Sequence, residues 1–178
     1  MDLCADVRVP FPRELVFAAY RDDMARLLPY LSNVRGIEVK SRKDEGPIAE
    51  IVNDWQGGGE IPVALRAVLG DSVLGWTDHA RWDALALRCH WRTETRAFAD
   101  AMQCSGCNAF LEDGAEGTLL EVRGALGIDA RKIRGVPGFL AGKVGRVAEE
   151  FLVAKVQSNL VDTAQGLARY LGDRARRA

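Results

Sequence analysis

The sequence predicts an α+β fold in which a curved antiparallel sheet wraps around a long C-terminal helix, with two short helices after the first strand. Two observations lead to this prediction. Between residues 3 and 128, apolar and polar residues alternate in successive short segments, which is the period of half-buried strands. From about residue 145 to 171, apolar residues recur at spacings of three and four, which is the period of an amphipathic helix. An antiparallel sheet needs a cover on one face, and this helix is the only predicted element large enough to provide it.

The composition is that of a soluble globular protein. The chain has 178 residues, a formal net charge of -1 and 48% hydrophobic residues. We expect one domain over residues 1–178, because a chain of this length buries roughly 70% of its unfolded surface, enough for a core with a cavity. The balanced charge argues against nucleic-acid binding. Because the sequence shows neither a signal-peptide pattern nor an apolar run of ~18 residues, we expect a cytoplasmic protein.

The start of the chain predicts one strand and two short helices. Residues 3–9 alternate between apolar and polar side chains, and Pro10 ends this strand. Residues 12–20 and 22–31 have the apolar spacing of short helices, with Asp22 as a cap between them.

The middle of the chain predicts strands interrupted by turns. The period changes to two from residue 34, and a turn follows at 44–47. The next strand has one inward face, formed by Ala49, Ile51, Asn53 and Trp55. The glycines at 57–59 end that strand, and residues 61–69 predict a short amphipathic helix.

Two hairpins follow, and their pairing can be predicted from the alternation. A turn at Asp83-Ala84 would place Trp76 opposite Trp91 and Asp78 opposite Cys89. The second hairpin, from residue 102 to 128, would place Asn108 opposite Val122 and Phe110 opposite Leu120.

At this point the sequence resembles the START-like superfamily, whose helix-grip fold includes polyketide cyclases and the major birch pollen allergen. The resemblance covers nearly the whole chain and rests on the segments VRVPFPRELVFAAYRD, LLPYLSNVRGIEV, GWTDHARWD, CHWRTE and FLAGKVGRVAEEFLVAKVQSNL. It implies a hydrophobic cavity between the sheet and the long helix, and lipid, sterol, quinone or polyketide ligands. These segments are not a catalytic signature, and the fold alone does not determine the function.

The predicted inward face carries a few polar residues among many apolar ones, as small-molecule sites do. From the sheet, the candidate ligand-binding residues are Asn53, Trp55, Trp76, Asp78, Trp91, Asn108 and Phe110; from the long helix, they are Val153, Val156, Leu160 and Ala164. The alternative is structural: Asp78 bonds a neighbouring backbone or tryptophan N–H group, or a bulge turns it outward, and the tryptophans pack as ordinary core.

Three classes of function fit this pattern. The first is a non-enzymatic carrier or binding protein for a hydrophobic small molecule such as a lipid, an isoprenoid or a polyketide. The second is an enzyme of the cyclase or aromatase kind, in which Asp78 is the acid–base group because burial raises the pKa of a carboxyl. The third is a protein-binding accessory domain, for which an apolar patch on the outer face of the sheet would be the sign.

No metal or cofactor is expected. Cys104 and Cys107 have a CxxC spacing, but residues three apart on a strand point to opposite faces, so the two thiols should not converge. His79 and His90 fall on predicted outward faces, where solvated histidines are common.

Two segments suit the mouth of a cavity and a transient membrane contact. Residues 61–69 are apolar at helical spacing and would gate the cavity. Residues 131–140 combine three cations with apolar side chains, a composition suited to an anionic membrane surface, although a solvated loop is the alternative.

Overall fold

Seven strands form one antiparallel sheet in the computed structural model, which describes residues 1–60, 74–96, 99–133 and 138–177. The strands are β1 (Asp2–Val9), β2 (Val34–Glu45), β3 (Ile48–Gly57), β4 (Gly75–Asp83), β5 (Arg88–Thr95), β6 (Met102–Asp113) and β7 (Gly117–Ile128). Their order across the sheet is β1-β7-β6-β5-β4-β3-β2, and every neighbouring pair is antiparallel.

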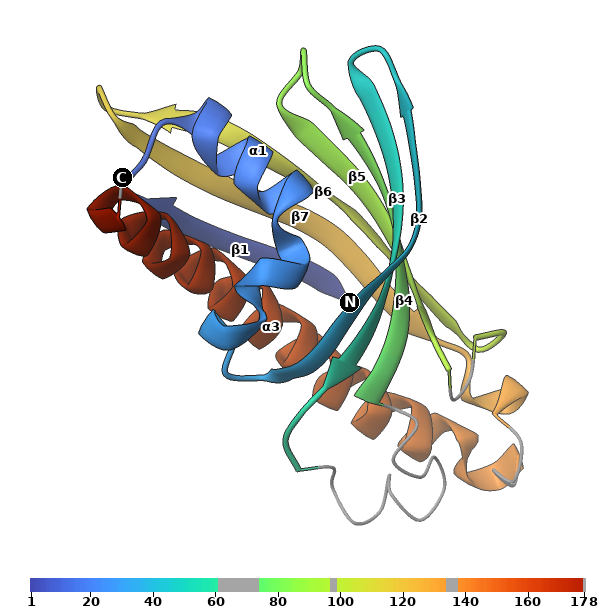
Figure 1. Cartoon of the computed structure of the whole chain (residues 1–178). Helices are drawn as coiled ribbons and strands as arrows, with labels where there is room; N and C mark the ends of the chain where they lie inside the picture. Colours follow the sequence, from blue (N-terminus) through green and yellow to red (C-terminus); the bar gives the residue numbers. More distant parts are fainter. Residues whose placement is uncertain (61–73, 97–98, 134–137, 178) are drawn as a thin grey trace.

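The described helices all lie on one side of this curved sheet (Figure 1). They are α1 (Arg13–Asp22) and the long α3 (Ala141–Arg177), with 3-10 turns at η1 (Met24–Tyr30), η3 (Ala130–Lys132) and η4 (Gly138–Leu140). The helix α3 packs against β1, β7 and η1, while α1 packs against β6 and β7. The predicted α+β architecture, a helix-grip fold, is confirmed.

Aromatic side chains hold α1 on the sheet. Phe17 and Tyr20 of α1 lie against Trp82 and Phe110, with ring centroids 5.2–5.9 Å apart. All four residues are buried, so this aromatic cluster anchors α1 on the sheet, and its Tyr20 and Trp82 also line the cavity described below.

The first predicted hairpin has a different register. The structure pairs Trp76 with Thr95 and Ala80 with Trp91, which shifts the predicted pairing by four residues. The reason is the turn: it extends over residues 84–87, since Asp83 Oδ1 accepts hydrogen bonds from two backbone N–H groups of this turn and Leu87 adopts a positive φ of 49°. Because the shift is an even number, every inward side chain stays inward.

The predicted pairing of the second hairpin and the predicted final helix agree better with the structure. The pairs Asn108–Val122 and Phe110–Leu120 are confirmed. The final helix begins earlier and ends later than residues 145–171, so the C-terminal tail is helical as far as Arg177. The strand β2 lies at the edge of the sheet and is largely exposed, with a register shift between Val39 and Ser41.

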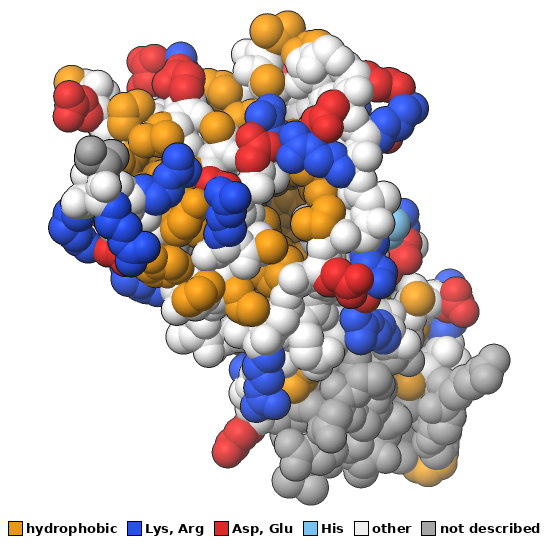
Figure 2. Space-filling view, in the orientation of Figure 1, with side chains coloured by type: hydrophobic (Ala, Val, Ile, Leu, Met, Phe, Trp, Pro, Cys, Tyr) orange, Lys and Arg blue, Asp and Glu red, His pale blue; other side chains and the backbone are white. Residues whose placement is uncertain are grey.

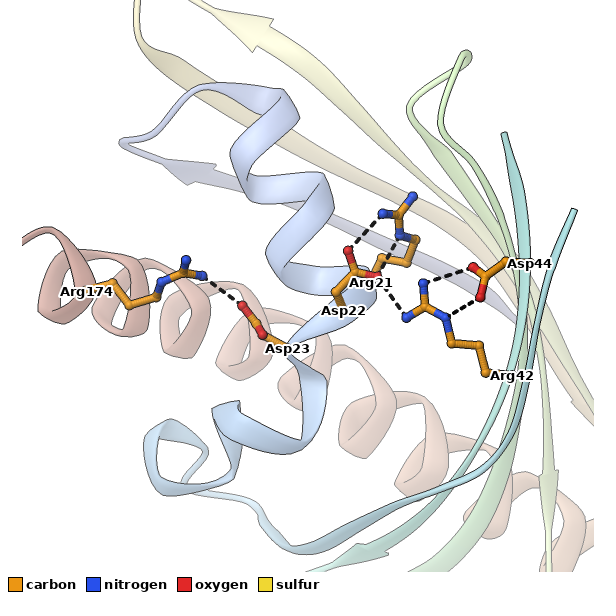
Figure 3. A network of polar contacts seen from close by, with 6 residues as sticks. All are labelled: Arg21, Asp22, Asp23, Arg42, Asp44 and Arg174. Carbon is orange, nitrogen blue, oxygen red and sulfur yellow. Dashed lines mark hydrogen bonds and ion pairs between the residues drawn. The ribbon is translucent and has the colours of Figure 1, made fainter. Parts of the chain in front are cut away.

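A chain of ion pairs ties the α1–η1 junction to both neighbouring elements (Figure 3). Asp22 pairs with Arg42 of β2 at 2.9 Å, and Asp23 pairs with Arg174 of α3 at 2.8 Å. Arg21 also binds Asp22, at 2.8 Å. The junction is therefore held to the β2–β3 hairpin on one side and to the long helix on the other.

Candidate functional site

A cavity lies between the inner face of the sheet and α3. Its lining comes from α1, η1, strands β3 to β7 and α3. In Figure 2 the surface is hollowed between the α1–η1 segment and the β2–β3 hairpin, and apolar side chains surround the hollow.

The cavity is large enough for a small organic molecule. Its volume is about 130 Å³, and about 1100 Å³ when the adjoining space open to solvent is included. An apolar cavity of about 150 Å³ is enough to bind a molecule the size of benzene.

The structure brings most of the sequence-predicted site residues together around this cavity. From the sheet, they are Asn53, Trp55, Trp76, Asp78, Trp91 and Asn108; from α3, they are Val156 and Leu160. Three of the predicted residues do not line the cavity: Phe110, Val153 and Ala164. Phe110 packs beneath α1, and Ala164 is fully buried in the core.

Two indoles form a stacked wall at one part of the cavity. Trp55 of β3 and Trp76 of β4 face each other directly across the strands, and their ring centroids are 5.6 Å apart with the planes nearly parallel. This pair offers a flat apolar surface to a ligand.

A third indole is held in place by glycines. Trp91 lies against the paired Gly106 and Gly124, where a Cβ atom at Gly106 would be 2.5 Å from the Trp91 ring. Its Nε1–H donates a hydrogen bond of 2.8 Å to Asn108 Oδ1. The structural alternative expected such a bond at Asp78, whereas the structure forms it at Asn108.

Asp78 occupies the centre of a polar row inside the cavity. The register places it between Asn53 of β3 and Thr93 of β5. Within the described part of the chain, Asp78 has no hydrogen bond or ion pair, and its partial exposure is to the cavity that it lines. Burial raises the pKa of Asp78 to about 7, so this carboxyl exchanges protons near neutral pH.

Several buried polar atoms around the cavity have no hydrogen-bond partner among the residues that the structure describes. They are Asn53 Oδ1, Trp55 Nε1, Trp82 Nε1, Thr95 Oγ1 and Asn159 Oδ1. Each belongs to a residue that lines the cavity. Buried side-chain polar atoms are normally paired with a hydrogen-bond partner. The concentration of unpaired atoms around the cavity therefore distinguishes its lining from the rest of the described core.

Sequence reasoning missed the polar residues that α3 contributes. Lys155, Asn159 and Thr163 line the cavity and follow one another at intervals of four residues. They share a helix face with the predicted Val156 and Leu160. The signal was present in this spacing, but polar residues of an amphipathic helix are ordinarily placed on the solvent side.

The cysteines and histidines are divided between the two faces of the sheet: Cys89 and Cys104 line the cavity, while Cys107 and both histidines lie on the outer face. Cys104 is buried and faces inward, whereas Cys107 lies on the outer face with its Sγ 4.0 Å from His90 Nε2. His79 Nε2 is 3.8 Å from Glu94 Oε2 on the same outer face. Among the described residues, no three side chains of the metal-binding types come together.

The segments proposed for membrane contact are only partly visible. Residues 61–69 and 134–137 lie outside the described residues. Phe139 is 86% exposed, while Arg131 is paired with Asp129 at 2.9 Å. None of the described helices combines the length and the apolar character that crossing a bilayer requires.

Comparisons with solved structures show the same fold. The protein TTHA0849 from Thermus thermophilus aligns over 96% of this chain and 99% of its own, with 19% identity and a TM-score of 0.65. The Zhui aromatase/cyclase from a Streptomyces species aligns over 98% and 95%, with 18% identity and a TM-score of 0.68. Norcoclaurine synthase from Thalictrum flavum, in complex with dopamine and hydroxybenzaldehyde, aligns over 97% and 87%, with 10% identity and a TM-score of 0.63.

These similarities establish the helix-grip fold of START-like and polyketide cyclase-like proteins. No protein-family model and no curated protein matches the sequence. At such identities the neighbours share the architecture with this chain, and the chemistry has to be argued from its own residues.

Proposed function

We propose that this protein binds one small, largely apolar molecule in the cavity between the sheet and α3. The observation that carries the proposal is that, in the described part of the chain, the buried side-chain polar atoms without partners all belong to lining residues. Leaving such an atom unpaired costs about 1–3 kcal/mol, and a ligand with hydrogen-bonding groups would recover much of that cost.

The lining residues suit different parts of such a ligand. The stacked Trp55 and Trp76 would lie against its apolar body. The polar row of Asn53, Asp78 and Thr93 would meet its hydroxyl or carbonyl groups, since these side chains offer both donors and acceptors. A lipid, an isoprenoid or a polyketide-like molecule with a few oxygen atoms has this combination.

Native mass spectrometry of the purified protein tests the proposal. We expect one ligand mass per chain after purification from cells, or after incubation with the neutral apolar dye N-phenyl-1-naphthylamine. We also expect the fluorescence of this dye to rise on binding and to fall when an apolar competitor is added. A protein that carries no ligand and binds no dye would contradict the proposal.

A second function, proton-transfer catalysis on the bound molecule, is favoured by one specific observation. Asp78 lies in the cavity with a pKa of about 7, which is suited to both accepting and donating a proton. The fold neighbours include an aromatase/cyclase and norcoclaurine synthase. An enzyme of this kind would use Asp78 to remove a proton next to a carbonyl group and to return it after ring closure.

The variant Asp78→Asn separates the two functions. It keeps the shape of the side chain but removes the proton-transfer group. If the protein is an enzyme, turnover of a poly-β-ketone substrate should fall at least about a hundredfold, the usual contribution of a general acid–base, while the dissociation constant changes little. If the wild-type protein turns over no such substrate, the binding function alone stands.

The accessory-domain alternative has no corresponding support in the described residues. The outward positions of β4 and β5 carry charged and polar side chains, among them Arg81, His90 and Arg92. An apolar patch on this face was the sign expected for a partner-binding role.

A further inference from the structure

We propose that the ligand carries an anionic group, and that Lys155 of α3 binds this group at one end of the cavity. This inference rests on the proposed binding function and narrows its ligand class to amphipathic anions, such as carboxylic acids with an apolar body.

Lys155 is the only cationic side chain among the described residues that line the cavity. Within the described part of the chain it forms no ion pair, although most of the arginines around the molecule are paired with carboxylates. An ammonium group beside an apolar cavity therefore lacks the counter-charge that such groups usually have.

The backbone around Lys155 makes room for this ammonium group. Gly59 has a positive φ of 99°, and a Cβ atom there would be 2.6 Å from Lys155 Nζ. Gly57 and Gly58 also line the cavity, but the Trp76 ring lies against Gly57 and the Arg35 side chain against Gly58. Gly59 is therefore the position that leaves room for Lys155 Nζ at this end of the cavity.

A second observation points to a ligand at the same place. Asn159 lies one turn beyond Lys155 on the same face of α3, and its Oδ1 atom is buried without a partner. Other orphan atoms lie across the cavity, on Trp55 Nε1 and Thr95 Oγ1. A molecule that placed a charged group at Lys155 would bring hydrogen-bonding atoms within reach of this end of the cavity.

Lys155 and Asp78 lie too far apart to neutralise each other. Asp78 is paired with Asn53, whereas Lys155 lies beside Gly59, beyond the end of β3. The four steps along the chain from Asn53 to Gly57 alone span about 13 Å of strand. Between the two ends stand the stacked Trp55 and Trp76. Along the cavity, a cationic group is therefore followed by two aromatic rings and then by the carboxyl of Asp78. This order matches a ligand with an anionic group at one end and oxygen atoms farther along.

The test uses two dyes that differ mainly in charge. N-phenyl-1-naphthylamine is neutral, and 1-anilinonaphthalene-8-sulfonate has the same aromatic body with a sulfonate. The variant Lys155→Met removes the charge and keeps an unbranched side chain, while Lys143→Met makes the same change at an exposed position of α3 outside the cavity lining. Fluorescence titration at about 0.15 M salt gives the dissociation constants.

We expect the wild-type protein to bind both dyes, and Lys155→Met to weaken binding of the sulfonate dye by about tenfold, the size of one charged hydrogen bond. Binding of the neutral dye should change less than twofold, and Lys143→Met should change neither. Equal effects of Lys155→Met on both dyes, or no effect on the sulfonate dye, would overturn the inference while leaving the binding function intact. Failure of the wild-type protein to bind either dye would instead contradict the binding function itself.

Discussion

At the scale of single residues, Asp78 should make the stability of the protein depend on pH. Its pKa is about 7 in the folded state, against about 3.9 for an unperturbed aspartate in the unfolded chain. Between these two pH values the folded protein holds a proton that the unfolded chain releases. The contribution of Asp78 to the free energy of unfolding is therefore largest below about pH 4 and falls as the pH rises toward 7. The difference between these two pKa values corresponds to at most about 4 kcal/mol of stability.

Urea unfolding at several pH values checks this expectation. The free energy of unfolding of the wild-type protein, minus that of Asp78→Asn, should decrease by a few kcal/mol between about pH 4 and pH 7 and level off above that range. The difference between the two proteins removes the contributions of all other titrating groups. A constant difference, or one that increases with pH, would show that Asp78 is not buried as the structure places it.

Residue-scale prediction from the sequence worked for the sheet and was incomplete for α3. In a strand the side chains alternate strictly, so the inward positions of Asn53, Asp78 and Asn108 followed from their neighbours. On a helix the boundary between the covered face and the solvated face is broad. A polar residue near this boundary is therefore predicted to face solvent. Lys155 and Asn159 were missed because they are polar residues that face a cavity.

At the scale of elements, turn chemistry limited what could be predicted. The β6–β7 turn contains Gly114 at a positive φ of 74°, a conformation that glycine adopts readily, and the pairing of that hairpin was predicted correctly. The β4–β5 turn has Leu87 at a positive φ, which is rare for a bulky residue and gives no sequence signal. The observed register of this hairpin therefore differs from the predicted one. The inward-facing residues were still predicted correctly, because the shift is an even number of residues.

Gly106 and Gly124, the glycine pair beneath Trp91, should be required for close packing of strands β5, β6 and β7. In Gly106→Ala the new methyl group would be 2.5 Å both from the Trp91 ring and from the carbonyl oxygen of Arg123, so ring and strand must move apart. We expect a loss of about 2–3 kcal/mol in the free energy of unfolding. Gly127→Ala is the control, because a Cβ atom there meets nothing within 4 Å in the same sheet. Similar urea midpoints for the two variants would be incompatible with the packing described.

At the scale of the whole molecule, the cavity depends on elements that are distant in the sequence. Strands from the middle of the chain provide one wall and the C-terminal helix provides the other, while α1 and η1 cover the side seen in Figure 2. Hydrophobic period and element order were enough to predict this arrangement, since a sheet and one long helix can bury their apolar faces only against each other. The ion pairs that fasten the cover could not be predicted, because they join side chains whose proximity arises only in the folded state.

These ion pairs lead to a prediction about ligand exchange. Asp22 binds Arg42 on the β2–β3 hairpin, beside the hollow, and Asp23 binds Arg174 on α3, so the α1–η1 junction is fastened on both of its sides. Neither aspartate is among the cavity-lining residues. The double variant Asp22→Asn/Asp23→Asn should loosen the cover without altering the bound state, and this would increase the association and dissociation rates of N-phenyl-1-naphthylamine by the same factor.

Stopped-flow fluorescence measures both rates of this exchange. We expect each rate to rise several-fold in the double variant, with a dissociation constant within about twofold of the wild-type value. High salt should speed exchange in the wild-type protein and have less effect in the variant, because it weakens the same partly exposed ion pairs. Glu14→Gln serves as the control, since it removes an exposed charge from the other end of α1. If exchange were equally fast in all three proteins, ligands would enter by a route that does not require the α1–η1 junction to move.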